Sequence, residues 1–104
     1  MKQLTPADSL DDLLLQHKHS LLYFTASWCG PCKSMSPVVE GVSKIMSEQL
    51  NTIKIDVDDS QSTAADYGVR SVPTLMLMKN DEIIDQRVGG LLPQQLVNWL
   101  EQLN

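Results

Sequence analysis

Residues 20–26, with the sequence SLLYFTA, are apolar on both alternating sets of positions. A strand with one face in water alternates apolar and polar side chains, whereas a strand covered on both faces is apolar throughout. This segment therefore predicts the central strand of a sheet that is covered on both faces. A chain that contains such a strand must cover both faces of the sheet with other elements.

Hydrophobic periodicity and turn residues predict the other elements. Helices are expected from residue 5 to about residue 17–19, at residues 30–49, at residues 60–67 and from Pro93 onward, and strands at residues 2–5, 52–57, 72–78 and 82–88, with a hairpin connection at 79–81. Pro37 predicts a kink in the longest helix, and Gly68 predicts the end of the short one. The apolar face expected for the last helix consists of Leu96, Val97, Leu100 and Leu103. This alternation implies an α/β fold with a mixed sheet between helices.

Length and charge restrict the organisation and the partners of the chain. With 104 residues the chain is too short for two ordinary domains, so we expect one domain over residues 1–104. We also expect the protein to be a monomer. We expect a cytoplasmic location, because no apolar run has the ~18 residues of a membrane span and acidic residues precede any signal-like stretch. The 13 acidic and 8 basic residues give a net charge of −5, which disfavours nucleic acid and anionic membranes as partners.

The chain has only two cysteines, Cys29 and Cys32, placed where the strand at 20–26 leads into the longest helix. Residues three apart on a helix have α-carbons roughly 5 to 5.5 Å apart, a distance that a disulfide accepts. Free backbone N–H groups and the helix dipole favour the Cys29 thiolate, so we predict an exposed nucleophile at Cys29 and a more buried resolving thiol at Cys32. Gly30 leaves room for a bulky partner, and Pro31 occupies an early helical position that needs no N–H donor.

Two other interpretations of the cysteine pair are half of a zinc site and a pair of inert core thiols. A structural zinc ion needs four ligands, and the remaining candidates, His17 and His19, are separated by one residue, which is not a usual zinc-site spacing. We therefore expect no bound metal, and we expect both histidines to be solvated at a helix end. The strand-to-helix context favours a redox pair over inert thiols.

The hexapeptide Trp28-Cys29-Gly30-Pro31-Cys32-Lys33 resembles the active-site motif of the thioredoxin family. The resemblance covers essentially the whole chain, and its further matching features are Phe24-Thr25-Ala26, Pro37, Lys54, Asp58, Val72-Pro73-Thr74 and Gly89-Gly90. It implies the thioredoxin fold, a central mixed β-sheet flanked by helices on both faces. It also implies a thiol–disulfide oxidoreductase that reduces protein disulfides through Cys29 and Cys32.

The resemblance assigns roles to residues around the two cysteines. It implies a cis peptide bond before Pro73, which brings backbone beside Cys29 so that a substrate can pair with it as an extended strand. Asp58 is expected to accept a hydrogen bond from the indole of Trp28, and Lys54 is expected to support the site. The implied docking surface for substrates consists of Trp28, Val57, Tyr67, Val72, Pro73, Gly89 and Gly90.

The same resemblance implies the partners. The substrates would be disulfide-containing proteins, the electron donor would be an NADPH-dependent thioredoxin reductase, and no cofactor is expected besides the redox-active disulfide Cys29–Cys32. Two alternatives stay open: an oxidase or isomerase of an oxidising compartment, and a non-catalytic binding subunit that uses the surface around Trp28. The Gly-Pro pair between the cysteines favours the reducing direction, and two intact cysteines favour catalysis over binding alone.

The resemblance breaks at Tyr23, six residues before the first cysteine. Thioredoxins typically carry a buried aspartate there, proposed to help deprotonate the resolving thiol and paired through the lysine that Lys54 matches. A phenol is a poor base at neutral pH, although its hydroxyl can form hydrogen bonds and its ring can fill core volume. Because no buried negative charge lies nearby, we expect less electrostatic repulsion of the Cys29 thiolate, and a resolving step that relies on water or another group. We also expect the folded state to avoid the cost in stability of a desolvated carboxylate. A smaller departure is Asp81, where the family commonly has glycine, and we expect slight strain in that hairpin.

Overall fold

The computed structural model of the chain describes residues 1–102. Its elements follow in the order β1 (Lys2–Gln3), α1 (Leu10–Leu15), β2 (His19–Thr25), α2 (Gly30–Ile45), β3 (Asn51–Asp56), α3 (Gln61–Asp66), β4 (Thr74–Lys79), β5 (Glu82–Val88) and α4 (Pro93–Leu100). Leu103, expected on the apolar face of the last helix, lies outside the described residues. Among residues 1–102, none of the helices has the length and apolar character that crossing a membrane requires.

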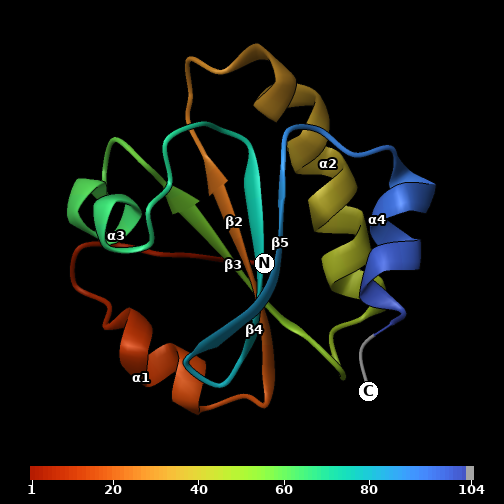
Figure 1. The fold of residues 1–104 in the computed structure, drawn as a ribbon, viewed down its shortest axis with the longest axis horizontal. Coiled ribbons are helices and arrows are strands. Elements are labelled where there is room, and N and C mark those ends of the chain that lie inside the picture. Colours follow the sequence, from red (N-terminus) through yellow and green to blue (C-terminus); the bar gives the residue numbers. More distant parts are fainter. Residues whose placement is uncertain (103–104) are drawn as a thin grey trace.

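The five strands form one mixed sheet in the order β1-β3-β2-β4-β5. The three strands β1, β3 and β2 run parallel, and β4 is antiparallel to both β2 and β5. Helices α1 and α3 lie on one side of this sheet and α2 and α4 on the other (Figure 1). The predicted α/β architecture is therefore confirmed, with β2 as the central strand.

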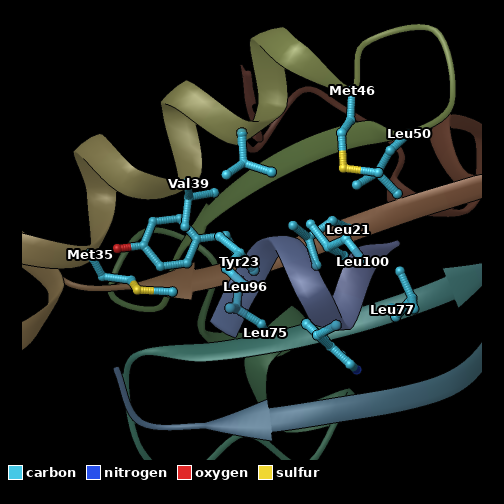
Figure 2. Packing of buried hydrophobic residues seen from close by; sticks show 12 residues of the cluster. Leu21, Tyr23, Met35, Val39, Met46, Leu50, Leu75, Leu77, Leu96 and Leu100 are labelled. Carbon is cyan, nitrogen blue, oxygen red and sulfur yellow. The ribbon is translucent and has the colours of Figure 1, made fainter. Parts of the chain in front are cut away.

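The alternation of side chains along β2 divides the core into two clusters. Leu21 and Tyr23 point to the face covered by α2 and α4, whereas Leu22 and Phe24 point to the face covered by α1 and α3. Figure 2 shows the first of these clusters, in which the ring of Tyr23 lies close to α2. Because the carboxyl end of β2 leads directly into α2, both core clusters fix the position of the loop that carries the cysteines.

Helix α1 begins later than the sequence predicted. The Asp8 carboxylate accepts a hydrogen bond from the Thr5 N–H at 2.8 Å and closes a separate turn, and the Ser9 hydroxyl then caps the helix. Threonine, proline and aspartate are typical of turns as well as of helix starts, which explains the error. The prediction for the histidines was also wrong for His19, which is the first residue of β2 and half-buried. Burial, followed by the nearby lysine charges, lowers its pKa below the usual value of histidine.

The β4–β5 hairpin does not place Asp81 in a strained conformation. Among residues 1–102, Asn80 is the only non-glycine residue with a positive φ, at 51°. Asparagine tolerates this left-handed conformation better than most residues, so the predicted strain at Asp81 is absent. A register shift between Leu77 and Met78 leaves Ile84 outside the regular pairing of the hairpin.

Candidate active site

Cys29 and Cys32 form a disulfide in the structure, and their α-carbons are 5.3 Å apart, as the helical spacing predicted. Cys29 has extended backbone angles and is the N-cap of α2, and its Sγ accepts the Cys32 N–H at 3.2 Å. The exposed fractions of the two residues are 5% and 1%. The order of burial agrees with the prediction, but Cys29 is much less exposed than expected because Val57 and Val72 pack against the two cysteines.

Apolar side chains surround the disulfide. Ala26, Val57 and Val72 pack against the two cysteines. The Val72–Pro73 peptide bond is cis, as the resemblance implied, and the Cys29 Sγ lies 3.7 Å from the Val72 carbonyl oxygen. This part of the predicted docking surface is therefore brought together at the carboxyl ends of β2 and β3 and the start of β4.

The indole of Trp28 projects outward beside the disulfide, with an exposed fraction of 67%. Its N–H donates a hydrogen bond to the Asp58 carboxylate at 2.8 Å, as expected. The ring of Tyr67 packs against Phe24, with a centroid distance of 6.1 Å, at the core cluster under α1 and α3. Burial raises the pKa of the Tyr67 hydroxyl, and three nearby aspartates add to this. Val57 and Val72, which pack against the cysteines, also contact this cluster, and the place of Tyr67 in the docking surface stays a prediction.

Three glycines near the disulfide are present for different reasons. Gly89 has a φ of 94°, which disfavours any side chain, and its N–H donates to the Pro73 carbonyl at 2.9 Å. Gly30 and Gly90 have no such φ, and a Cβ at either position would meet no atom within 4 Å. The fold itself therefore does not require glycine at these two positions.

Tyr23 is fully buried beneath the cysteines, and its hydroxyl lies in a compact polar cluster in which two hydroxyl protons serve three short contacts. The phenol lies 2.8 Å from the Ser36 hydroxyl and 3.1 Å from the Cys32 carbonyl oxygen, to which it donates. Ser36 donates to the same carbonyl at 2.9 Å. In Figure 2 the hydroxyl points toward the N-terminal turns of α2. Both properties expected of this phenol, a hydrogen bond and filled core volume, are confirmed.

A cavity of about 530 Å³ lies behind Cys32, between α2, β1 and β3. Lys54 is the register partner of Tyr23 on β3, so its side chain lies on the same face of the sheet and reaches this cavity. The cavity is lined by Met1, Gln3, Thr25, Ala26, Ser27, Cys32, Lys33, Ser36, Pro37, Glu40, Lys54 and Asp56. Within residues 1–102, no group of three or more histidine, cysteine or acidic side chains is arranged to hold a metal ion.

The comparison with known families decides the affiliation of the chain. The family model described as Thioredoxin matches residues 1–102. The chain belongs to the thioredoxin family. Family membership together with the Cys29–Cys32 disulfide identifies a thiol–disulfide oxidoreductase of the protein-disulfide reductase type. Thioredoxins in general act on disulfide substrates and are recharged by thioredoxin reductase.

Similar proteins include several bacterial thioredoxins. The chain is 44% identical to thioredoxin of Haemophilus influenzae over 82 residues, which cover 79% of this chain and 77% of that protein. It is 33% identical to thioredoxin of Rhodospirillum rubrum over 101 residues, 97% of each chain. A solved mutant thioredoxin from Halobacterium salinarum superposes with a TM-score of 0.87 at 36% identity, covering 96% of this chain and 87% of that one.

Sequence reasoning missed two residues near the thioredoxin disulfide. Ser36 lies four residues after Cys32 on α2, and a serine at this spacing commonly donates to the carbonyl one turn earlier, so the signal was present. Met35 is the second: its Sδ accepts the Leu91 N–H at 3.5 Å and ties the β5–α4 loop to α2. A backbone donor 56 residues away along the chain leaves no local trace in the sequence.

Proposed function

We propose that the chain acts as a monomeric, single-domain cytoplasmic electron carrier, which passes two electrons from an NADPH-dependent thioredoxin reductase to the disulfides of protein substrates. A reducing carrier fits a compartment in which thiols are kept reduced. The observation that carries the proposal is the position of Cys29 as the N-cap of α2, where its sulfur accepts a backbone N–H.

In the first step, the reduced Cys29 thiolate attacks one sulfur of the substrate disulfide. A mixed disulfide forms, the substrate S–S bond breaks, and the second substrate sulfur leaves as a thiolate that takes up a proton. The Cys32 N–H and the dipole of the 16-residue helix α2 favour negative charge on Cys29 before the attack.

In the second step, Cys32 loses its proton and attacks the Cys29 sulfur of the mixed disulfide. The substrate leaves as a dithiol, and the Cys29–Cys32 disulfide forms, so the substrate gains two electrons and two protons. Water that enters the cavity behind Cys32 is a suitable proton acceptor, because the carboxylates of Glu40 and Asp56 line this cavity beside Lys54 and favour the positive charge that the water takes up. Tyr23 and Ser36 support the step by holding the Cys32 carbonyl in place.

The docking surface holds the substrate beside Cys29. The cis Val72–Pro73 bond places the Val72 carbonyl next to the Cys29 sulfur, where an extended segment of the substrate can pair with the backbone. Trp28, oriented by Asp58, supplies exposed apolar contact area on one side. Gly30 and Gly90 have no side chain that would block the substrate from reaching the Cys29 sulfur. This explains why glycine is present at positions where the fold does not require it.

Insulin reduction tests this function. We expect the wild-type chain to catalyse insulin reduction with dithiothreitol as the donor, and with NADPH and a thioredoxin reductase. Cys29→Ser should abolish turnover. Cys32→Ser should retain the first step and accumulate a mixed disulfide with the substrate, which mass spectrometry detects.

Other outcomes of this assay contradict the proposal. A wild-type chain that is inactive with dithiothreitol would indicate a binding subunit. Accumulation of the mixed disulfide in Cys29→Ser rather than in Cys32→Ser would reverse the two roles.

A further inference from the structure

Two exposed apolar side chains beyond the surface already described, Val88 and Leu92, lie on segments that are attached to the region of the disulfide. Among residues 1–102, the large hydrophobic residues that are exposed are Leu15, Trp28, Ile45, Ile83, Ile84, Val88 and Leu92. Trp28 directly precedes Cys29, and Val88 pairs with Thr74, the residue after Pro73. Leu92 follows the loop between β5 and α4. Two hydrogen bonds attach this loop to the region of the disulfide, one from Gly89 to Pro73 and one from Leu91 to Met35.

Leu92 does not have the residue type that its position in the fold favours. It is the N-cap of α4, where serine, threonine, aspartate and asparagine stabilise a helix by accepting a hydrogen bond from the first turn. A leucine side chain has no acceptor, so the hydrogen bonds of Leu92 are made by its backbone: its N–H donates to the Gln95 side chain at 2.9 Å, and its carbonyl accepts the Leu96 N–H at 3.1 Å. Leu92 also contributes little to the core, because 68% of it is exposed. Neither capping nor packing within the chain accounts for this leucine.

The segment between the disulfide and Leu92 offers little obstruction to a partner. Gly90 carries no side chain although a Cβ there would meet nothing within 4 Å. Residues 89–93, with the sequence GGLLP, contain no charged side chain. A polypeptide docked at Val72 and Pro73 can therefore continue across this loop to an apolar contact.

We propose that Leu92 extends the docking surface onto the start of α4 and contacts an apolar side chain of the protein substrate. This proposal rests on the proposed function. The occupant is a segment of the disulfide-containing substrate, because the contact is continuous with the surface that receives that substrate at Cys29. The contact is remote from the reacting sulfurs, so it acts on substrate binding and changes KM more than kcat.

The test is Leu92→Ser, which removes the apolar side chain and supplies a helix cap. We expect kcat/KM for insulin relative to kcat/KM for cystine to fall about threefold to tenfold, mainly through a higher KM for insulin. Leu92→Met, which keeps an apolar contact, should restore the ratio. The matched control is Leu15→Ser, which removes another exposed leucine, 62% exposed, at the end of α1. It should leave the ratio at the wild-type value.

Three results would contradict this proposal. A wild-type ratio in Leu92→Ser, or an equal loss on insulin and cystine, would overturn the contact at Leu92 and leave the proposed function in place. An equal fall in Leu15→Ser would show that the effect is not local to the docking surface. A wild-type chain that reduces neither disulfide would instead overturn the proposed function, and the Leu92 contact with it.

Discussion

Tyr23 is the residue at which this chain departs most clearly from its family. Its hydroxyl, together with Ser36, satisfies the carbonyl of Cys32, and its ring fills the core between β2 and α2. A neutral side chain at this depth brings no desolvated charge into the core. The consequence is that the side chain beneath the resolving thiol contributes to packing and hydrogen bonding.

We predict that Tyr23→Asp is less stable than Tyr23→Asn. Both variants lose the aromatic ring and should lose about 3 kcal/mol or more in the free energy of unfolding, because Tyr23 is fully buried. At neutral pH the aspartate variant should lose more, since only it carries a buried charge. Burial raises the pKa of a carboxyl, so the difference should shrink as the pH falls and the carboxyl is protonated. Urea unfolding of both variants between pH 5 and pH 8 measures this.

An aspartate variant as stable as the asparagine variant at every pH would contradict this account of the core. The same pair tests the resolving step. A resolving rate, measured on the mixed disulfide, that is the same in Tyr23→Asp as in the wild type would show that a carboxylate at this position has no influence on Cys32.

At the scale of elements, three side chains attach α4 to the edge strand β5. The Asp85 carboxylate accepts the Trp99 indole N–H at 2.8 Å and pairs with Arg87 at 2.9 Å. The guanidinium of Arg87 lies 4.9 Å from the centroid of the Trp99 ring. Two of these contacts join β5 to α4, and the pair of Asp85 and Arg87 holds their two β5 side chains together, so we expect them to stabilise the position of α4.

We predict that the contribution of Asp85 to the stability of the protein decreases at acidic pH. The hydrogen bond from Trp99, followed by that from the Gln86 N–H, lowers the pKa of Asp85 below its usual value. A carboxyl with a lowered pKa stabilises the folded protein fully at pH values above its ordinary pKa of about 4. This contribution is lost as the pH falls from that value through the lowered pKa of the folded protein. Asp85→Asn should therefore be less stable than the wild type at pH 7, and the difference should narrow below pH 4. Thermal unfolding across this range measures the effect.

The matched control for this prediction is Asp12→Asn, a change of an exposed carboxylate in the first turn of α1 that leaves α4 untouched. If the difference in unfolding temperature between wild type and Asp85→Asn stays constant from pH 7 to pH 3, the charge of the Asp85 carboxylate does not contribute to stability, which would contradict the prediction.

The hairpin between β4 and β5 gives a second prediction at this scale. Asn80 has a φ of 51°, a conformation in which alanine is strained by about 1 kcal/mol. Asn80→Ala should therefore lower the free energy of unfolding by about that amount, whereas Asp81→Ala should change it by less than about 0.5 kcal/mol. Urea unfolding of the two variants compares them directly. A larger loss in Asp81→Ala would place the strain where the sequence first suggested it.

At the scale of the whole molecule, the sequence predicted the architecture well because the patterns that specify it are local. The two apolar faces of β2 and the branched residues of β3 identify buried strands without knowledge of their partners. Their assembly into the thioredoxin fold followed from the resemblance around Cys29 and Cys32. The start of α1 was wrong because the Asp8 turn uses the residues of a helix start.

The contacts that the sequence did not reveal join segments far apart in the chain. Trp99 and Asp85 are 14 residues apart, and Met35 and Leu91 are 56 residues apart. Neither pair has a spacing that a helix or strand period would single out. Leu92 did leave a signal, an apolar residue directly before Pro93 at the expected start of a helix, but its exposure becomes known only from the packed structure.

We predict that the protein is a monomer, and sedimentation equilibrium at micromolar concentrations should give a mass of 11.6 kDa. The strand β5 is an edge of the sheet, and such edges favour association with other chains. Here the irregular pairing at Ile84 and the net charge of −5 oppose pairing between the β5 edges of two chains. A mass that doubles with protein concentration would contradict this.

The cavity behind Cys32 has a consequence for the timing of catalysis. Its lining includes none of Trp28, Val72 and Gly90, which belong to the proposed docking surface for the substrate. A substrate held as a mixed disulfide therefore covers one side of the redox pair and leaves the other side in contact with solvent. The proton of the resolving thiol can leave by this rear route while the substrate is still bound, so the attack of Cys32 on the mixed disulfide does not have to wait for the docked surfaces to separate.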